Sequence, residues 1–596
     1  MIKVVNPLLV SALKNLRSVF MGHVSYRLVI IYVCVLCGFS NAYAETEKDE
    51  NISSEEAQKL GRENFVYPGG VTKNTPEKAP RIAVKQFIIN GIVERPEKDI
   101  SREKILKLVE EIRSSQTDGF SILEFRKVTD ALTQYYRQRG FFLARAFIPE
   151  QDVRNDTVEI NIIEGILDKV EFQGNKLYSD KQLAEFFKPQ LGKPVLSDTM
   201  ESSLLLIDDY PGLKVSGLFQ PGAEAGKTTL IIKALSEKKF ENYLTFDNAG
   251  TESTGLYRTM LRIHGNNLTH SADSLNLNIL QTVNPTNSTY YSFYYERPFL
   301  NSSYSTGFGY SNNAFVVGQF LAELDVEGTS DITNVFLRKN IQRSRDRNYG
   351  FSLDLSKKNA ESTQSIQSIG EDILTVLSAS VDFTYSDKVL GGYNQGIFQY
   401  SQGLPDFLGS MDENGNGNSS RQGSSGNRAG GDFDKLLVNY VRVQPIKSIT
   451  SSDTFKNQSL MLRLTMQYSK DLLTSLEQFP LGGPNSVRAY PSSEKLVDST
   501  TFFSAEWIAR AVDTEGANWL QGLQLSVFLD YAKGEVNEPL TNDAASVNLS
   551  GVGAAVQISP HNAEFEARLD ISRALSSEEP SNEQSLQYFF KLGYHF

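Results

Sequence analysis

The sequence contains very little cysteine and histidine. Only two of its 596 residues are cysteine and five are histidine, and both cysteines, Cys34 and Cys37, lie near the N-terminus. The rest of the chain can therefore form neither a disulfide framework nor a thiol nucleophile. His264 and His270 have no cysteine or carboxylate cluster around them, so we expect no metal site and no cofactor. Because a G-x-S-x-G motif is also absent from the sequence, nothing in it indicates an enzyme.

Long hydrophobic runs are equally scarce. Hydrophobic residues make up 40% of the chain and the mean hydropathy is −0.31, which excludes a bundle of membrane helices. The clearest apolar run, from Leu28 to Phe39, follows a leader without acids and precedes the small-x-small triplet Ala42-Tyr43-Ala44. This run is too short to span a bilayer as a helix. We therefore predict that residues 1–44 are a signal peptide and that the protein is exported.

An excess of positive charge is lacking too. The net charge is −12, and loss of the leader, with its basic residues Lys3, Lys14, Arg17 and Arg27, would make it more negative. An acidic protein of this kind is poorly suited to bind nucleic acid.

One segment, "PGAEAGKTTL", has some likeness to a phosphate-binding loop. Gly222 and Gly226 enclose three residues, however, where that pattern requires four. The segments on both sides alternate like strands, whereas a phosphate-binding loop leads into a helix. We therefore predict a β-hairpin here and expect no nucleotide partner.

Residues 81–238 contain one order of elements twice, after a polar segment and linker over residues 45–80. Residues 81–165 contain a strand, a helix from Ser101 to Arg113, a second helix that opens at a capping box of Ser121 and Glu124, and two further strands. Residues 166–238 repeat the order, with a Ser-Asp pair expected to cap each helix. The sequence thus predicts two α+β modules of similar size.

From Phe240 onward the helical period disappears and strict alternation begins. In "EFEARLDIS" the apolar residues Phe565, Ala567, Leu569 and Ile571 face one way and charged or polar residues face the other. Such segments have the length of a tilted strand that crosses a bilayer, and about sixteen of them follow one another. We predict an all-β transmembrane barrel of about sixteen antiparallel strands over residues 240–596, in preference to a soluble sandwich or propeller, whose strands are usually shorter.

The predicted connections differ in length with the parity of the strands. Long ones follow odd-numbered strands, namely Asn359–Asp372, Gly403–Gly431, Asp471–Leu496 and Gly534–Ala545. Outer-membrane barrels have short periplasmic turns and long outer loops, so the chain is expected to enter the barrel from the periplasm. The Gly/Ser/Asn-rich loop Gly403–Gly431 is expected to be mobile and solvated.

The stretch "LGGPNSVRAYP" breaks the alternation inside the loop 471–496. Its glycines and prolines favour a loop that folds back into the lumen, where Arg488 would need an anionic partner. On the strand "LQLSVFLDYAKG", the parity of the apolar residues places Phe528 and Asp530 inside the barrel. We therefore predict an ion pair between Arg488 and Asp530 that holds the loop tip in the channel.

Two segments of this chain resemble known motifs, namely Val487-Arg488-Ala489-Tyr490 in the loop and Phe528 with Asp530 on the strand. They are similar to the V-R-G-Y/F and F-x-D-x-G motifs of the barrel-assembly and two-partner-secretion superfamily. With two N-terminal modules, the chain is similar to two-partner secretion transporters of the hemolysin-activator type. Ala489 and Ala532 stand where glycine is commoner in the motifs. The resemblance implies that the modules are POTRA (polypeptide-transport-associated) domains in the periplasm, and that an unfolded exoprotein, a hemolysin, adhesin or contact-dependent toxin, crosses the outer membrane through the barrel.

The same resemblance suggests how the modules receive the exoprotein and how the barrel is assembled. An extended client could add a strand to a POTRA sheet edge, for which "KVEFQGN" and "TTLIIKAL" are candidates. The last strand ends on a terminal aromatic residue, which implies recognition by the barrel-assembly machinery before insertion into outer-membrane lipid. The residues on its apolar face are Tyr588, Phe590, Leu592, Tyr594 and Phe596.

Three alternative functions stay open at this point. A barrel-assembly factor uses the same motif pair but usually carries more POTRA units. A passive porin-like channel needs neither the periplasmic modules nor the arginine loop. In an adhesin or receptor, the long outer loops would carry the function.

Overall fold

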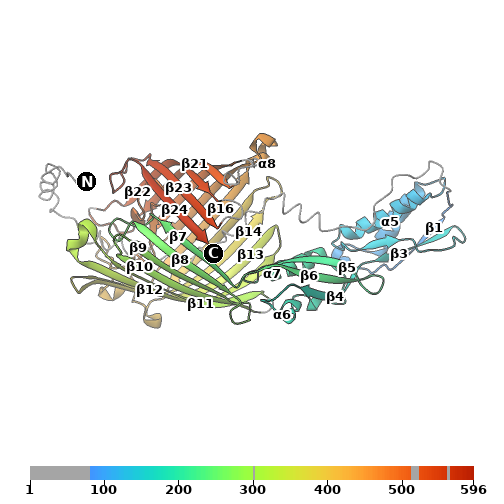
Figure 1. Cartoon of the computed structure of the whole chain (residues 1–596), viewed down its shortest axis with the longest axis horizontal. Coiled ribbons are helices and arrows are strands. Elements are labelled where there is room, and N and C mark those ends of the chain that lie inside the picture. The colour runs from blue at the N-terminus through green and yellow to red at the C-terminus, as the bar shows by residue number, and fades with distance from the viewer. Residues whose placement is uncertain (1–80, 300–301, 512–521, 542, 560–563) are drawn as a thin grey trace, which may run out of the picture.

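The structure is a computed structural model that describes residues 81–299, 302–511, 522–541, 543–559 and 564–596. Two small α+β modules extend from one end of a closed barrel of sixteen strands (Figure 1). The predicted signal peptide (residues 1–44) and the linker (residues 45–80) lie outside the described residues. No helix in the described ranges is long and apolar enough to cross a membrane.

The first module is a three-stranded sheet covered by two helices. The strand order is β1-β3-β2, with β1 parallel and β2 antiparallel to the central β3. Its elements are β1 (Gln86–Asn90), η2 (Pro96–Lys98), α4 (Arg102–Ser114), α5 (Ile122–Arg137), β2 (Arg145–Phe147) and β3 (Thr157–Ile163). Ser121 and Glu124 form the predicted capping box at the start of α5.

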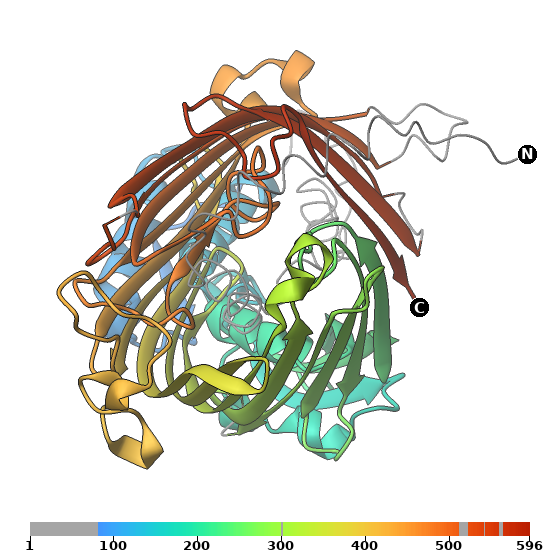
Figure 2. The same ribbon diagram turned by 90° about the vertical axis from the view of Figure 1, so that its left-hand side faces the viewer.

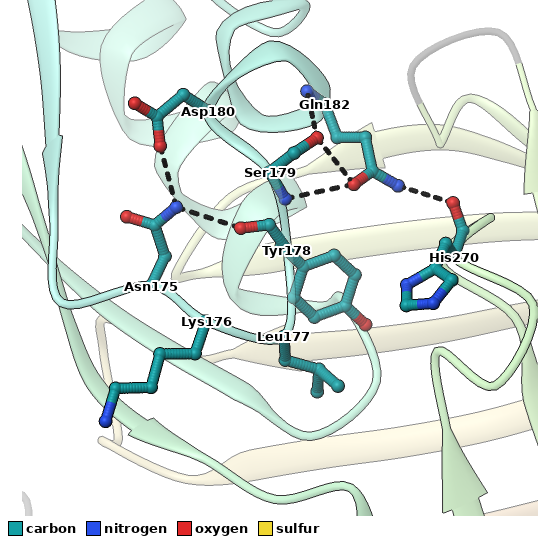
Figure 3. Close-up of a pocket in the computed structure, with 8 residues that line it drawn as sticks. All are labelled: Asn175, Lys176, Leu177, Tyr178, Ser179, Asp180, Gln182 and His270. Carbon is teal, nitrogen blue, oxygen red and sulfur yellow. Dashed lines mark hydrogen bonds between the residues drawn. The ribbon is translucent and has the colours of Figure 1, made fainter.

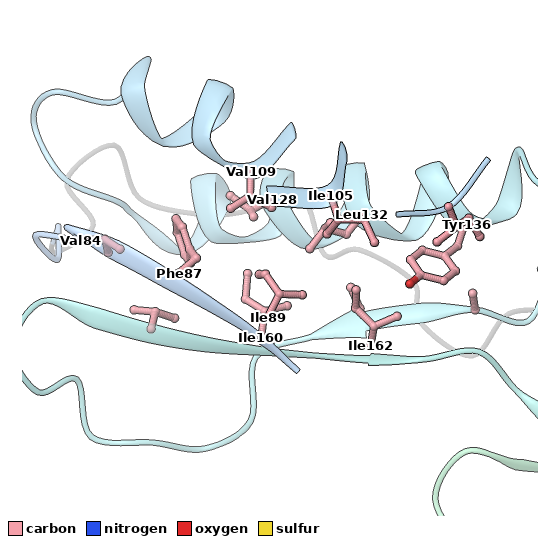
Figure 4. Close-up of a cluster of buried hydrophobic side chains, with 14 of the residues drawn as sticks. Val84, Phe87, Ile89, Ile105, Val109, Val128, Leu132, Tyr136, Ile160 and Ile162 are labelled. Atoms are coloured by element: carbon pink, nitrogen blue, oxygen red, sulfur yellow. The ribbon is translucent and has the colours of Figure 1, made fainter. Parts of the chain in front are cut away.

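The core of this module lies between the apolar face of the sheet and the apolar stripes of α4 and α5. Ile89 and Ile160 are almost fully buried on the sheet face below the helices. The helices contribute Ile105 and Leu132, both with no exposed surface, so the apolar stripe of each helix meets the apolar face of the sheet (Figure 4).

The second module has the sheet order β4-β6-β5. Its elements are β4 (Ile166–Gln173), α6 (Asp180–Ala184), η3 (Lys188–Gln190), α7 (Ser197–Asp208), β5 (Leu213–Pro221) and β6 (Lys227–Glu237). The Gly222–Gly226 segment connects β5 and β6 as an antiparallel hairpin, with Pro221 opposite Thr228.

Two predictions for the second module are wrong in detail. Ser179 caps α6 as predicted, but Leu196 holds the cap position of α7 and Ser197 is already helical. The segment "TTLIIKAL" lies in β6, which is the central strand and is paired on both sides, so it cannot offer a free edge to a client. The segment "KVEFQGN" lies mainly in β4, which is an edge strand of this sheet.

The second module packs against the periplasmic end of the barrel. Ala272, in the turn after the second barrel strand, is 2% exposed and belongs to the hydrophobic core of the module. The amide of Gln182 donates to the carbonyl oxygen of His270 (2.7 Å) beside an open pocket of about 640 Å³ (Figure 3). Arg343 donates to both carboxylate oxygens of Asp209, at 2.6 Å each.

The barrel is closed by pairing of its first and last strands, and Figure 2 looks into it from the end opposite the modules. Its sixteen antiparallel strands agree with the predicted number. They are β7 (Phe240–Asp247), β8 (Tyr257–Asn266), β9 (Ser274–Val283), β10 (Ser288–Phe299), β11 (Tyr304–Val316), β12 (Val326–Arg343), β13 (Arg347–Gln364), β14 (Gln367–Ser386), β15 (Tyr393–Gly403), β16 (Asp434–Pro445), β17 (Gln458–Tyr468), β20 (Ser499–Arg510), β21 (Leu523–Glu535), β22 (Ser546–Ile558), β23 (Phe565–Ala574) and β24 (Gln587–His595).

One predicted outer loop is in fact strand. The residues from Asn359 to Asp372 belong to β13 and β14, which are joined by the two-residue turn Ser365-Ile366. These strands are longer than a bilayer crossing requires and continue as a hairpin beyond it. The prediction failed because the projecting part is polar on both faces, so the apolar alternation that marks a membrane strand stops before the strand does.

The Gly/Ser/Asn-rich loop is folded onto the barrel instead of being solvated throughout. It covers residues 404–433 and contains η5 (Phe407–Gly409) and η6 (Gly415–Gly417). Met411, Ala429 and Phe433 are buried, at most 3% exposed. Smaller elements in other connections are η4 (Gln319–Leu324), α8 (Ile446–Thr450) and η7 (Asp453–Phe455).

Candidate functional site

The loop between β17 and β20, residues 469–498, turns back into the barrel. It is stiffened at its base by a short hairpin of β18 (Phe479–Leu481) and β19 (Lys495–Val497). After β18, Gly482 and Gly483 have φ of +93° and +89°, a conformation that strongly favours glycine, and this turns the chain toward the tip. The residues after them contact inward-facing side chains of β20, β21 and β23, so we call this segment the re-entrant loop.

Arg488, at the tip of the re-entrant loop, is 2% exposed and pairs with Asp530 of β21. Its Nε donates to Oδ2 (2.8 Å) and its Nη2 donates to Oδ1 (2.9 Å), a bidentate arrangement. The backbone N–H of Arg488 donates to the same carboxylate at 3.1 Å. Asp530 has no exposed surface, so the pair is removed from water on both sides. The structure therefore brings together the two residues that the sequence analysis paired.

Phe528 precedes Asp530 by one inward position on β21 and lies beneath the guanidinium. The Cζ atom of Arg488 is 3.2 Å from the centre of the Phe528 ring, and Phe528 is 2% exposed. A planar guanidinium that stacks on an aromatic face gains cation–π attraction, which is larger where water is excluded. The F-x-D spacing thus supplies a ring and a carboxylate to the same arginine from one strand.

Two further acids complete the surroundings of Arg488, and the sequence analysis did not single them out as site residues. Nη1 of Arg488 donates to Oε2 of Glu506 on β20 at 2.7 Å and lies 3.4 Å from Oδ1 of Asp570 on β23. Arg568, also on β23, donates to both acids, at 3.0 Å to Glu506 and at 2.8 and 2.9 Å to Asp570. We call Arg488, Asp530, Glu506, Asp570 and Arg568 the lumen charge cluster.

A signal for these residues was present in the strand pattern. Arg568 and Asp570 lie on the polar face of "EFEARLDIS", and that face is the inside of the barrel. Pairing of neighbouring strands places Glu506 opposite Phe528 on β21. Strand parity alone could not show which inward charges reach the loop, because this depends on the register between strands far apart in the sequence.

Val487, Ala489 and Tyr490 are buried beside Arg488 and belong to a hydrophobic cluster with Phe502 and Ala532. The hydroxyl of Tyr490 lies 2.6 Å from Ser576 Oγ and donates to the carbonyl oxygen of Glu578 at 2.8 Å. The loop tip is thus held by apolar contacts as well as by charge.

The alanines that depart from the motifs lie where the loop meets the wall, Ala489 on the loop and Ala532 on β21. Ala489 lies over Gly551 of β22, where an added Cβ would come within 2.3 Å of the Ala489 Cβ. Ala532 has no exposed surface, and the next inward position holds Gly534. A glycine on the wall therefore makes room for the side chain that the loop carries at position 489.

The outer part of the re-entrant loop has a second charged anchor. Glu477, 1% exposed, accepts from Nζ of Lys358 on β13 at 2.7 Å and also pairs with Lys435 of β16. Its carbonyl oxygen accepts from Lys435 (3.2 Å) and from Gln467 (3.0 Å). The loop is therefore attached to the barrel wall at two places by ion pairs. Glu477 of the loop meets lysines of β13 and β16, and Arg488 of the loop meets acids of β20 and β21.

The predicted C-terminal assembly residues lie on the outside of the barrel. Tyr588, Leu592, Tyr594 and Phe596 are 40–56% exposed, and Phe590 on the same face is partly buried. β24 pairs with β23 on one side and with β7 on the other, where only five residue pairs are in register.

Comparisons with known proteins identify relatives of the whole architecture. Residues 226–558 match the family described as haemolysin secretion/activation protein ShlB/FhaC/HecB, and residues 87–165 match the POTRA domain of ShlB type. The chain is 23% identical over 456 residues to the heme/hemopexin transporter protein HuxB of Haemophilus influenzae, an alignment that covers 74% of this chain and 75% of HuxB. The alignment with HuxB of H. influenzae strain 86-028NP, 27% identical, spans 39% of that protein. The outer membrane transporter CdiB of Escherichia coli is 22% identical over 494 residues, 78% of each chain.

Solved structures with the same fold include two CdiB proteins. CdiB from Escherichia coli superimposes with a TM-score of 0.65 at 19% identity, covering 91% of this chain and 97% of that chain. CdiB from Acinetobacter baumannii gives a TM-score of 0.58 at 17% identity, covering 91% and 96%. BamA from Haemophilus ducreyi, without its first three POTRA domains, gives 0.50 at 14% identity and covers 87% of this chain and all of that chain. At these identities the superpositions show the fold alone.

Proposed function

The chain belongs to the haemolysin secretion/activation family, the outer-membrane transporters of two-partner secretion, and we propose that it exports one large unfolded exoprotein from the periplasm to the cell surface. The exoprotein is a hemolysin, an adhesin or a contact-dependent toxin, the three kinds of client that the family resemblance implies. The family is one of transporters, and the lumen charge cluster suits a binding role. It holds a loop in place by opposed charges and contains no nucleophile paired with a base.

The observation that carries this proposal is the position of Arg488. A buried bidentate pair with Asp530, a ring beneath the guanidinium and two further acids hold the tip of the re-entrant loop inside the lumen. A loop held in this way restricts the channel, which a passive pore does not require. In our proposal the loop keeps the lumen closed at rest and shifts as the client passes.

The POTRA modules deliver the client in this proposal. In the second module β4 and β5 are the edge strands, so an extended client adds a strand to one of these two and not to β6. Nucleotide and nucleic acid have no part in this step, and folding of the client outside the cell supplies the direction of transport. Contact with outer-membrane lipid, and with the barrel-assembly machinery during biogenesis through Tyr588, Phe590, Leu592, Tyr594 and Phe596, belongs to the same proposal.

Barrel assembly is the second candidate function, because BamA has the same fold. The two α+β modules and the match to the secretion family favour export. The test is co-expression of the chain with a candidate exoprotein in a Gram-negative host, followed by measurement of the exoprotein in the medium. Export that requires the chain supports the proposal. Unchanged export together with defective insertion of other barrels would support barrel assembly.

A further inference from the structure

The outer loop, residues 404–433, covers the exposed edge of a long strand. β15 pairs with β14 only from Val376 to Ser386, so in the described part of the chain the outer half of β14 has no strand on this side. The outer loop takes the place of the missing strand, since the backbone N–H groups of Leu404 and Met411 donate to the carbonyl oxygens of Thr375 and Ile373, each at 2.8 Å. Asp372 accepts from the hydroxyls of Ser419 and Ser420. These contacts fix the outer loop against the outer half of β14.

Arg421 of the outer loop contacts the base of the re-entrant loop. Its guanidinium pairs with Asp498, the last residue before β20, with Nη1–Oδ1 of 2.5 Å and Nη2–Oδ2 of 2.8 Å. Nη1 also donates to the carbonyl oxygen of Leu473 at 2.6 Å, and Nη2 to that of Asn537 at 3.1 Å. One side chain therefore joins three connections that lie far apart in the sequence.

Asp498 depends on this arginine for charge balance. It has no exposed surface, and the side chain of Arg421 is 13% exposed. The backbone N–H groups of Leu473 (3.2 Å) and Asn537 (2.7 Å) also donate to the carboxylate, but they carry no net charge. A buried carboxylate that loses its cation is strongly destabilised in place, and it gains by moving toward water.

Beyond the proposed export function, on which this inference rests, we propose that Arg421 is a positioning residue for transport. It holds the base of the re-entrant loop at Asp498 while Arg488 holds the tip, so that the outer loop and the re-entrant loop move as one unit. The tip can leave the lumen charge cluster only when the outer loop shifts on β14. Export is then coupled to an element at the cell surface that the transport motifs do not include.

The protein suits a distance measurement with spin labels, because the two cysteines of the sequence, Cys34 and Cys37, lie in the predicted signal peptide and would be removed with it. Spin labels are introduced at Asn485→Cys, an exposed position near the loop tip, and at Lys388→Cys, an exposed position in a periplasmic turn of the full-length protein. The distances between them are measured in wild type, Arg421→Ala, Asp498→Asn and the double variant. Arg428→Ala is the matched control, since Arg428 lies in the same outer loop and donates to Ser419 of that loop.

We expect Arg421→Ala to raise the population of displaced re-entrant loop at least about tenfold, because an unpaired buried charge is expelled. Asp498→Asn added to Arg421→Ala should reverse most of the displacement, since the buried charge that drives it is gone. Export of the co-expressed exoprotein should fall by at least about fivefold in Arg421→Ala, the lower end of typical coupling, and should be unchanged in Arg428→Ala.

A wild-type distance distribution in Arg421→Ala would overturn the inference, and so would purely additive effects of the two substitutions. Failure of wild type to export any exoprotein would instead count against the proposed function, while the distances would still test the coupling. Heat-modifiable migration of the barrel on gels verifies that each variant is folded in the outer membrane.

Discussion

The methyl group of Ala489 occupies the space that Gly551 leaves on β22. A Cβ added at Gly551 would lie 2.3 Å from the Cβ of Ala489 and 3.3 Å from the carbonyl oxygen of Arg573, so only the first contact is prohibitive. The space between positions 489 and 551 therefore holds only one methyl group.

This relationship predicts a reciprocal rescue. Gly551→Ala should weaken docking of the loop tip by about 1–3 kcal/mol, the usual effect of overpacking, and should lower export. Ala489→Gly combined with Gly551→Ala should recover export, because the pair again contains one methyl group. Val552→Ala, on the lipid-facing side of the same strand, is the control. Equal export by the single and double variants would show that this contact does not govern docking.

The lumen charge cluster predicts that charge exchange between Arg488 and Asp530 fails. Arg488→Ala should cost about 3–5 kcal/mol of docking, as expected when one partner of a buried ion pair is removed. Arg488→Asp with Asp530→Arg should export no better, because the new acid would face Glu506 and Asp570. Export assays on the two variants, with the barrel quantified in the membrane, test this. Recovery in the exchanged variant would mean that Asp530 is the sole partner that matters.

The joint between the second module and the barrel predicts a different kind of defect. Ala272→Asp would place a charge in the core of the module and should cost at least about 2 kcal/mol of contact with the barrel turn. Spin-label distances between module and barrel should broaden while the barrel stays folded. Ala272→Gly suits the φ of +57° at this position and should leave the distances unchanged. Unaltered distances in Ala272→Asp would show that the turn is not an anchor.

The capping box of α5 predicts a pH dependence in the first module. Hydrogen bonds from the side chain and backbone of Ser121, and then Arg81, lower the pKa of Glu124 from 4.5 to about 2. Because the pKa is lower in the folded state, the stabilisation is present above pH 4.5 and is lost as the pH falls toward 2.

Thermal unfolding of residues 81–238 measures this effect between about pH 5 and pH 2, a range that includes the unfolded and folded pKa values of Glu124. Glu124→Gln should flatten the dependence, whereas Glu103→Gln, at an exposed position of α4, should not. An unchanged slope in Glu124→Gln would assign the acid sensitivity to other groups.

The barrel and the Arg488–Asp530 pair could be predicted because each depends on local pattern. Two-residue alternation marks a strand wherever one face meets lipid, and parity along β21 places Asp530 inside. The contacts of Glu506 and Arg568, and the pair of Arg421 with Asp498, could not be predicted, since they depend on how distant segments meet in space. The ends of β13 and β14 were missed for another reason, because a strand that leaves the membrane loses its apolar face while it keeps its hydrogen bonds.

The most direct test of the account is co-expression of the chain with a candidate exoprotein in a Gram-negative host, comparing wild type, Arg488→Ala and an empty vector. The account predicts exoprotein in the medium only with wild type, and a strong reduction with Arg488→Ala although its barrel is folded in the outer membrane. Full export by Arg488→Ala, at equal barrel levels, would contradict the claim that the buried arginine holds the loop through which transport is controlled.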